Sequence, residues 1–145
     1  MGTNIIPEGF ALLDRDSPFS DLTGPYYEKL DSYGKHEVLA IRLSQEHLNK
    51  VRLAHGGLLM TLADNAFGDA IKAHHDKPVS FVTVSFNSEF LAAAHAGDWV
   101  EARVTINRAG RRLIFAQCAL SVDAKNIFNA SAVFAIIELS PDKTD

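Results

Sequence analysis

The sequence predicts an α+β fold in which one long helix is wrapped by a curved antiparallel sheet. Residues 57–73 carry apolar side chains at helical spacing over an unusually broad arc. The segments around them alternate apolar and polar residues, as half-buried antiparallel strands do. The strands after the helix are joined by tight turns, and such a sheet covers both the helix and its own inner face only by curling around the helix.

The first 25 residues predict an extension laid over the core, because prolines and a glycine interrupt short apolar runs there. We expect a short helix and a loop in this extension. Two strands should follow between Tyr26 and Ser44, around a turn at residues 32–35. After the long helix, further strands are expected at residues 79–91, 99–107, 112–122 and 127–139, with turns at residues 96–98, 108–111 and 123–126.

Composition limits the possible functions. The chain has 145 residues, of which 47% are hydrophobic and 22% charged, which is typical of a globular protein. No repeat or linker divides it, so residues 1–145 are expected to form a single domain with residues 1–25 as its extension. The net charge of −4 gives no electrostatic reason to expect nucleic acid. The sequence shows neither a basic leader nor a membrane-spanning run, and the expected localisation is cytoplasmic.

Cysteine and histidine usage predicts no metal site. The single cysteine, Cys118, lies in an apolar run that is typical of a buried strand, and we expect it to pack in the core. Adjacent helical residues point about 100° apart, so His74 and His75 are poorly placed to share a metal ion. They are expected to end the long helix instead, since cations favour a helix C-terminus.

The start of the long helix is the most informative stretch. His55, Gly56 and Gly57 precede an apolar helix that carries a carboxylate, Asp64, about two turns further on. Adjacent glycines allow another molecule to approach the backbone closely, and the free N–H groups of a helix N-terminus attract an anion or oxyanion. This pattern favours a binding or catalytic site over a purely structural turn.

Two motifs carry a family resemblance. The run from Asn49 to Gly57 reads NKVRLAHGG, and residues 62–67 read LADNAF. Together they resemble the signature of hotdog-fold acyl-CoA thioesterases of the PaaI, or phenylacetic acid degradation, type. The resemblance extends over residues 26–139 and implies the hotdog fold, in which the expected element order recurs.

The resemblance implies a role for several residues. The Gly57 N–H would donate to the thioester carbonyl oxygen as negative charge develops there, with Gly56 leaving room for the substrate. Asp64 would act as nucleophile or as general base toward water, from the neighbouring subunit. Asn49 would help to place the carbonyl or the water, although a loop asparagine equally forms a local turn. His55 either donates to the substrate or orients the loop.

Other residues are implied at the edges of the site. Thr83 would face the carboxylate across the dimer and orient water, and Ser85, expected on the same strand face, competes for that role. A basic turn would meet the phosphates of coenzyme A, unless it is simply solvated, through Arg108, Arg111 and Arg112. Met60, Phe67 and Phe90 would line an acyl pocket or belong to the core.

The implied function is hydrolysis of a small or medium acyl-CoA, or an aryl-CoA, to a carboxylate and free coenzyme A. No metal or redox cofactor is expected, because water, a carboxylate and an oxyanion donor suffice for thioester hydrolysis, and coenzyme A is part of the substrate. The implied site lies between two subunits of a homodimer, often paired into a homotetramer. Two alternatives are a noncatalytic acyl-CoA-binding hotdog protein and a hotdog enoyl-CoA hydratase or dehydratase.

The chain also departs from the family pattern. Many relatives have glycine three residues after the asparagine, where this chain has Arg52. Many also have proline after the third strand, where this chain has Ala92, Ala93 and Ala94. Neither change involves the expected catalytic atoms, so the two departures bear on the substrate more than on the reaction.

Overall fold

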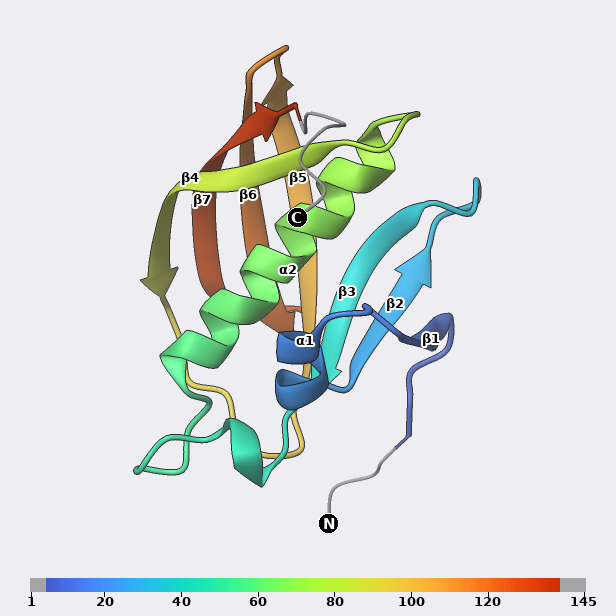
Figure 1. The fold of residues 1–145 in the computed structure, drawn as a ribbon. Helices are drawn as coiled ribbons and strands as arrows, with labels where there is room; N and C mark the ends of the chain where they lie inside the picture. The colour runs from blue at the N-terminus through green and yellow to red at the C-terminus, as the bar shows by residue number, and fades with distance from the viewer. Residues whose placement is uncertain (1–4, 139–145) are drawn as a thin grey trace.

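The computed structural model describes residues 5–138, and its strands form one curved antiparallel sheet around a single long helix (Figure 1). The elements in chain order are β1 (Phe10–Leu13), α1 (Pro18–Thr23), β2 (Tyr26–Leu30), β3 (His36–Arg42), the 3₁₀ turn η1 (Gln45–His47), α2 (Gly56–His74), β4 (Ser80–Phe90), β5 (Trp99–Ala109), β6 (Leu113–Val122) and β7 (Lys125–Ile137). The strand order across the sheet is β1-β2-β3-β5-β6-β7-β4. This is the architecture that the sequence predicts.

Helix α2 begins and ends where the sequence predicts, to within one residue. The His55 side chain caps its start by accepting a hydrogen bond from the Gly57 N–H. At the other end, His74 is the last helical residue and His75 Nδ1 lies 2.8 Å from the Ile71 carbonyl oxygen. The expectation that the two histidines end the helix is confirmed.

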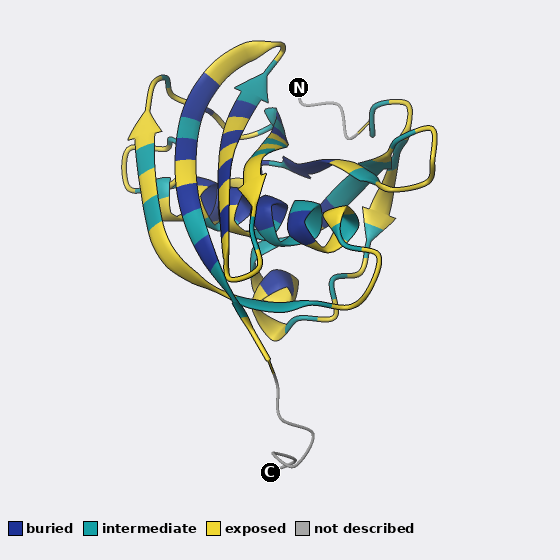
Figure 2. Cartoon of the chain, turned by 90° about the horizontal axis from the view of Figure 1, so that it is seen from above, coloured by how far each residue is buried: buried dark blue, intermediate teal, exposed yellow. Residues whose placement is uncertain are grey.

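The core lies between α2 and the concave face of the sheet. Strand β6 buries every second side chain from Ile114 to Leu120, and β7 does the same from Phe128 to Phe134 (Figure 2). Helix α2 buries Leu59, Leu62, Phe67 and further apolar residues against them. Cys118 belongs to this buried row, as its apolar surroundings in the sequence predict.

The structure adds an edge strand that the sequence analysis does not predict. Strand β1 is only four residues long and pairs with β2. Its side chains are exposed or half-buried, so the sequence shows neither a long alternation nor a continuous apolar run there. The expected short helix is present as α1. Position 139, where the last strand was expected to end, lies outside the described residues.

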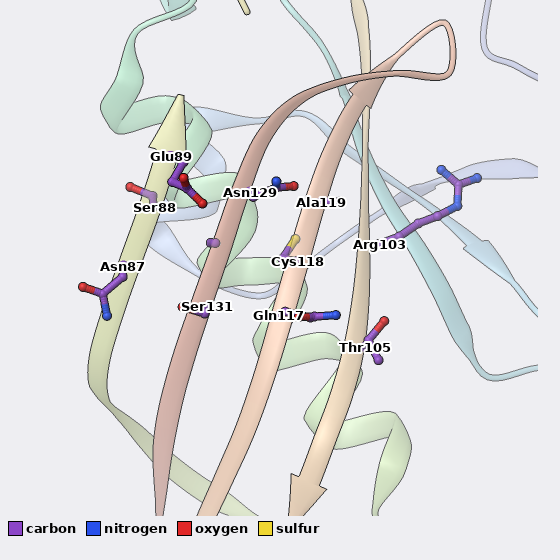
Figure 3. A pocket seen from close by; sticks show the side chains of 11 residues that line it. Asn87, Ser88, Glu89, Arg103, Thr105, Gln117, Cys118, Ala119, Asn129 and Ser131 are labelled. Carbon is purple, nitrogen blue, oxygen red and sulfur yellow. The ribbon is translucent and has the colours of Figure 1, made fainter. Parts of the chain in front are cut away.

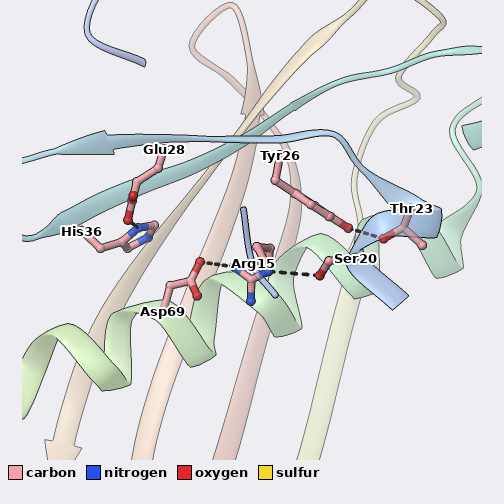
Figure 4. Close-up of polar contacts among 7 residues, drawn as sticks. All are labelled: Arg15, Ser20, Thr23, Tyr26, Glu28, His36 and Asp69. Atoms are coloured by element: carbon pink, nitrogen blue, oxygen red, sulfur yellow. Dashed lines mark hydrogen bonds and ion pairs between the residues drawn. The ribbon is translucent and has the colours of Figure 1, made fainter. Parts of the chain in front are cut away.

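Residues 15–24, here called the N-terminal strap, contact α2 through Arg15. Arg15 forms an ion pair with Asp69 of α2 and donates through Nε to Ser20 Oγ at 3.2 Å (Figure 4). The Thr23 hydroxyl lies 2.7 Å from the Tyr26 hydroxyl, and the Thr23 carbonyl oxygen lies 2.6 Å from Nε2 of the buried His47. The strap is therefore fixed at both of its ends.

Asp69 is largely buried under the strap. Burial raises the pKa of this carboxyl, and the nearby Arg15 guanidinium opposes that increase. Near it, His36 Nδ1 lies 2.8 Å from Glu28 Oε1. No helix among residues 5–138 is both long and apolar enough to cross a membrane.

Candidate active site

Asp64 lies on the one stripe of α2 that the sheet leaves uncovered. Gly57, Met60 and Asp64 are exposed along this stripe, whereas the opposite side of the helix is buried. Thr83 of β4 donates from its hydroxyl to Asp64 Oδ1 at 3.2 Å. This contact joins two residues of the same chain. The expectation that Thr83 faces the carboxylate across a dimer stays a prediction.

A cavity of about 360 Å³ opens beside this carboxylate. Its walls come from α1, α2 and β4 and are mainly apolar: Phe19, Met60, Thr61, Asp64, Asn65, Thr83 and Phe86. Met60 thus lines a cavity and not the core, one of the two placements that the sequence left open. Phe67 is fully buried in the core, and Phe90 is absent from the cavity wall. A carboxylate at the mouth of an apolar cavity is suited to act on a polar group whose apolar portion fills that cavity.

The start of α2 provides a second polar feature. The Gly57 N–H donates to His55 Nδ1 at 2.8 Å, so the expected oxyanion donor is engaged by its own chain. A Cβ added at Gly56 would lie 3.1 Å from the Phe90 ring, which shows how closely the backbone approaches the end of β4. A carbonyl oxygen that binds the Gly57 N–H must displace or share the His55 acceptor.

The loop before the helix is organised by Asn49. Its Oδ1 accepts hydrogen bonds from the N–H groups of Val51 at 3.0 Å and Leu53 at 3.1 Å. The turn role that the sequence left open is therefore present. Within residues 5–138, Asn49 Nδ2 makes no hydrogen bond, so the side chain keeps a donor for a ligand.

A bulge separates the two hydroxyl residues of β4. The register against β7 shifts between Thr83 and Ser85, so Val84 is the extra residue. Ser85 therefore turns to the outer face, where Asn87 Nδ2 donates to its Oγ at 3.3 Å. The expectation that Ser85 shares the face of Thr83 is wrong, because a period-two pattern does not reveal where an extra residue enters a strand.

The predicted basic cluster lies at the other end of β4 from Gly57. Arg112 precedes β6, and its carbonyl accepts from Ile136, which pairs with Phe81 at the start of β4. Gly56 instead approaches Phe90 at the end of that strand, about 30 Å away along an extended backbone. Arg108, Arg111 and Arg112 are all exposed. One subunit does not bring these arginines to its own helix N-terminus.

A second hollow lies on the outer face of the sheet. It has a volume of about 550 Å³ and polar walls from four strands, including Asn87, Glu89, Arg103, Gln117 and Asn129 (Figure 3). None of the residues predicted for the site lines this hollow. Among residues 5–138, no group of three or more His, Cys, Asp or Glu side chains is arranged to hold a metal ion.

Four residues of the cavity wall were not expected there from the sequence: Phe19, Thr61, Asn65 and Phe86. Phe19 comes from the N-terminal strap, and Asn65 follows the carboxylate on α2. Asn65 Nδ2 is buried without a hydrogen-bond partner among the described residues. Neither Phe19 nor Asn65 has a local sequence signal, because Phe19 reaches the cavity through a contact between distant segments and Asn65 occupies an ordinary helical position.

The spacing along α2 restricts the chemistry. Asp64 lies seven positions after Gly57, which is about 10 Å along a helix axis at 1.5 Å per residue. A nucleophile and an oxyanion donor must both lie about 3 Å from the atoms of one reacting carbonyl group. The two groups of a single subunit therefore do not act on the same carbonyl.

Comparisons of sequence and of structure relate this chain to thioesterases and esterases. Residues 51–124 match the model of the thioesterase superfamily. A Pseudomonas aeruginosa protein named "Putative esterase PA0474" is 38% identical over 129 residues, which cover 89% of this chain and 96% of that protein. A mutant structure of the phenylacetic acid degradation protein PaaI from Thermus thermophilus has a TM-score of 0.70 and 27% identity, covering 82% of this chain and 98% of that one. The Bacillus halodurans protein BH2602, solved with CoA, has a TM-score of 0.70 at 18% identity, covers 78% of this chain and 74% of its own, and shares the fold.

Proposed function

Since this chain belongs to the thioesterase superfamily and is a thioester hydrolase, we propose that it hydrolyses a small or medium acyl-CoA, or an aryl-CoA, at Asp64. The carboxylate at the mouth of the apolar cavity, held by Thr83, is the observation that carries this proposal. The presence of CoA in the Bacillus halodurans structure and the name of the Thermus thermophilus relative support a coenzyme A ester as substrate.

The proposed active unit is a homodimer. Gly57 and Asp64 of one subunit are too far apart to share a carbonyl, so the carboxylate must come from a second copy. Strand β4 is an unpaired edge of the sheet with exposed Val82 and Val84, which makes it a natural site for strand pairing. Antiparallel pairing there sets two α2 helices side by side in opposite directions. We further propose that two such dimers form a tetramer.

This arrangement also suggests a role for the basic turn. In an antiparallel pair, the start of one β4 lies beside the end of the other. The cluster of Arg108, Arg111 and Arg112 near the start of β4 would then approach the other subunit's helix N-terminus. Guanidinium groups in that position suit the phosphates of coenzyme A.

Asp64, the Gly57 N–H and a water molecule are sufficient for the proposed hydrolysis. In one route, Asp64 takes a proton from a water whose oxygen bonds to the thioester carbon, and the oxyanion forms at the Gly57 N–H. The C–S bond then breaks and the thiolate leaves with a proton as CoA–SH. In the other route, Asp64 bonds to the carbon first and coenzyme A leaves as the thiolate. Water then cleaves the resulting anhydride, which frees the acyl carboxylate, regenerates Asp64 and supplies the proton that converts the thiolate to CoA–SH. A rapid-quench mass measurement that finds an acyl adduct on Asp64 supports the second route.

The first test is the release of free thiol from short, medium, long and aryl acyl-CoA esters. We expect Asp64→Asn to lower kcat/KM by about 10²–10⁴-fold, because it removes the base or nucleophile while keeping the side-chain shape. The affinity for coenzyme A should remain unchanged.

Asp76→Asn is the matched control, since Asp76 is an exposed carboxylate just beyond the same helix. It should retain wild-type turnover. Ester binding without turnover by either wild-type or Asp64→Asn protein would contradict hydrolysis and support the noncatalytic acyl-CoA-binding protein instead.

A further inference from the structure

We propose that the N-terminal strap forms one wall of the acyl-binding cavity and that Phe19 determines which acyl groups fit beside Asp64. The proposal rests on the proposed function, since it assigns a substrate portion to the cavity at that site. The expected occupants are compact aryl groups and medium-length acyl chains.

The position of Phe19 is the first argument. Phe19 lines the same cavity as Asp64 and Thr83, although it lies 45 positions before the carboxylate in the sequence. Its side chain is 56% exposed, so much of the ring is left uncovered by its own chain. A half-exposed ring in a cavity wall offers apolar contact area to a ligand.

The anchoring of the strap is the second argument. Helix α1 is only six residues long and would not hold a ring in place by itself. Arg15 joins the strap to Asp69 of α2, and the Thr23 hydroxyl joins it to Tyr26 (Figure 4). The Thr23 carbonyl oxygen also contacts His47. Asp69 and Asp64 lie on the same helix, so the anchor fixes the distance between the ring and the carboxylate.

The size and lining of the cavity set the ligand class. A volume of about 360 Å³ is at the small end of the range for ligand pockets, roughly 300–1,000 Å³. Phe19, Met60 and Phe86 supply apolar surface to this volume. These walls suit a single ring or a medium chain, whereas a long fatty acyl chain exceeds the space available.

The test compares kcat/KM for acetyl-, hexanoyl-, phenylacetyl- and palmitoyl-CoA between the wild type and Phe19→Ala. We expect about a tenfold loss for hexanoyl- and phenylacetyl-CoA, a change of less than about twofold for acetyl-CoA, and a relative gain for palmitoyl-CoA. Leu22→Ala is the matched control, because Leu22 lies on the same helix, is 81% exposed and is not part of the cavity wall. It should leave the profile unchanged.

A second variant tests the ion pair between Arg15 and Asp69, which holds the strap on α2. Arg15→Gln removes the ion pair with Asp69 but alters no residue of the cavity wall. As a positioning residue, Arg15 should shift the acyl profile in the same direction as Phe19→Ala, mainly through KM for the bulkier esters. A selectivity profile identical to that of the wild type would contradict the proposed role of the strap.

Other outcomes separate this proposal from the proposed function. Equal losses for all four esters together with dissociation of the oligomer would assign Phe19 to a subunit interface and overturn the proposal. The same series should be repeated as binding of nonhydrolysable thioether analogues of these esters to Asp64→Asn protein. A dependence of that binding on Phe19 supports the cavity wall even if the wild type hydrolyses none of the esters, whereas a flat binding profile overturns it.

Discussion

Arg52 holds its backbone in the left-handed region, with a φ of 65°. Its position is the third residue after Asn49, in the loop that Asn49 Oδ1 organises through Val51 and Leu53. A residue with a Cβ is strained by roughly 1–2 kcal/mol in this conformation, whereas glycine adopts it freely. The loop of this chain therefore keeps the backbone shape for which a glycine is suited, but with an arginine.

We predict that Arg52→Gly raises the free energy of unfolding by about 0.5–1 kcal/mol. The relief of backbone strain outweighs the greater chain entropy of glycine in the unfolded state. Urea unfolding at one fixed protein concentration measures this gain. Arg52→Ala is the control, because alanine removes the charge but retains the Cβ. An equal gain in both variants would attribute the effect to charge rather than to backbone conformation.

The residues of the site differ in how far the sequence alone predicted their positions. Asp64 and His55 occupy the helix positions expected from the motif, because a helix places its residues by simple periodicity. The side chains that these residues contact could not be predicted from the sequence. The bulge at Val84 turns Ser85 to the outer face, and the Asp64–Thr83 bond joins residues of two elements that lie 19 positions apart in the sequence.

At the scale of the elements, β6 shows what a buried strand does to a titratable group. Its inward row runs from Ile114 to Leu120 and includes Cys118, whose exposed fraction is 3%. Burial raises the pKa of the Cys118 thiol to about 12 from its usual 9.0. The thiolate is therefore excluded from this strand at every physiological pH, and the folded protein should resist thiol reagents.

We predict that this thiol makes the fold less stable in alkali. Above about pH 9 the unfolded chain releases the thiol proton while the folded chain retains it, so the unfolded state is favoured as pH rises toward 12. The free energy of unfolding should fall by up to about 1.4 kcal/mol per pH unit more in the wild type than in Cys118→Ala. Urea unfolding of both proteins from about pH 8 to pH 11 measures the difference. Parallel curves would show that the thiol does not contribute.

The helices and strands differ in how accurately the sequence predicted them, and the reasons are physical. The bounds of α2 and of the four strands from β4 to β7 follow from long periodic patterns, and they agree with the structure to within two or three residues. Strand β1 lacks such a pattern because it is short and lies at the edge. The strap contact between Arg15 and Asp69 joins residues that lie 54 positions apart in the sequence. Local sequence patterns do not predict a contact between such distant residues.

At the scale of the whole molecule, the separation of Gly57 and Asp64 along α2 determines how many subunits the proposed active site needs. If each site takes its oxyanion donor from one subunit and its carboxylate from another, two differently inactivated chains should restore one site in a mixed dimer. Gly57→Pro removes the backbone donor, and Asp64→Asn removes the carboxylate.

We predict that mixing Gly57→Pro and Asp64→Asn proteins, after dissociation and reassembly, restores about a quarter of the wild-type specific activity, since half of the dimers are mixed and each has one intact site. Each variant alone should remain inactive. Gly57→Ala is the control for the backbone donor, because it keeps the N–H and its Cβ meets only the movable His55 side chain, at 3.0 Å. Failure of the mixture, with mixed dimers demonstrated by mass, would contradict a shared site.

The hydrogen bond from the Gly57 N–H to His55 Nδ1 has a kinetic consequence for the proposed hydrolysis. A substrate carbonyl competes with this internal acceptor, and each 1.4 kcal/mol by which the closed arrangement is favoured lowers the apparent affinity about tenfold. This competition raises KM, so the rate keeps rising with the concentration of the ester over a wider range. His55 would thus keep turnover proportional to the supply of substrate instead of saturated by it.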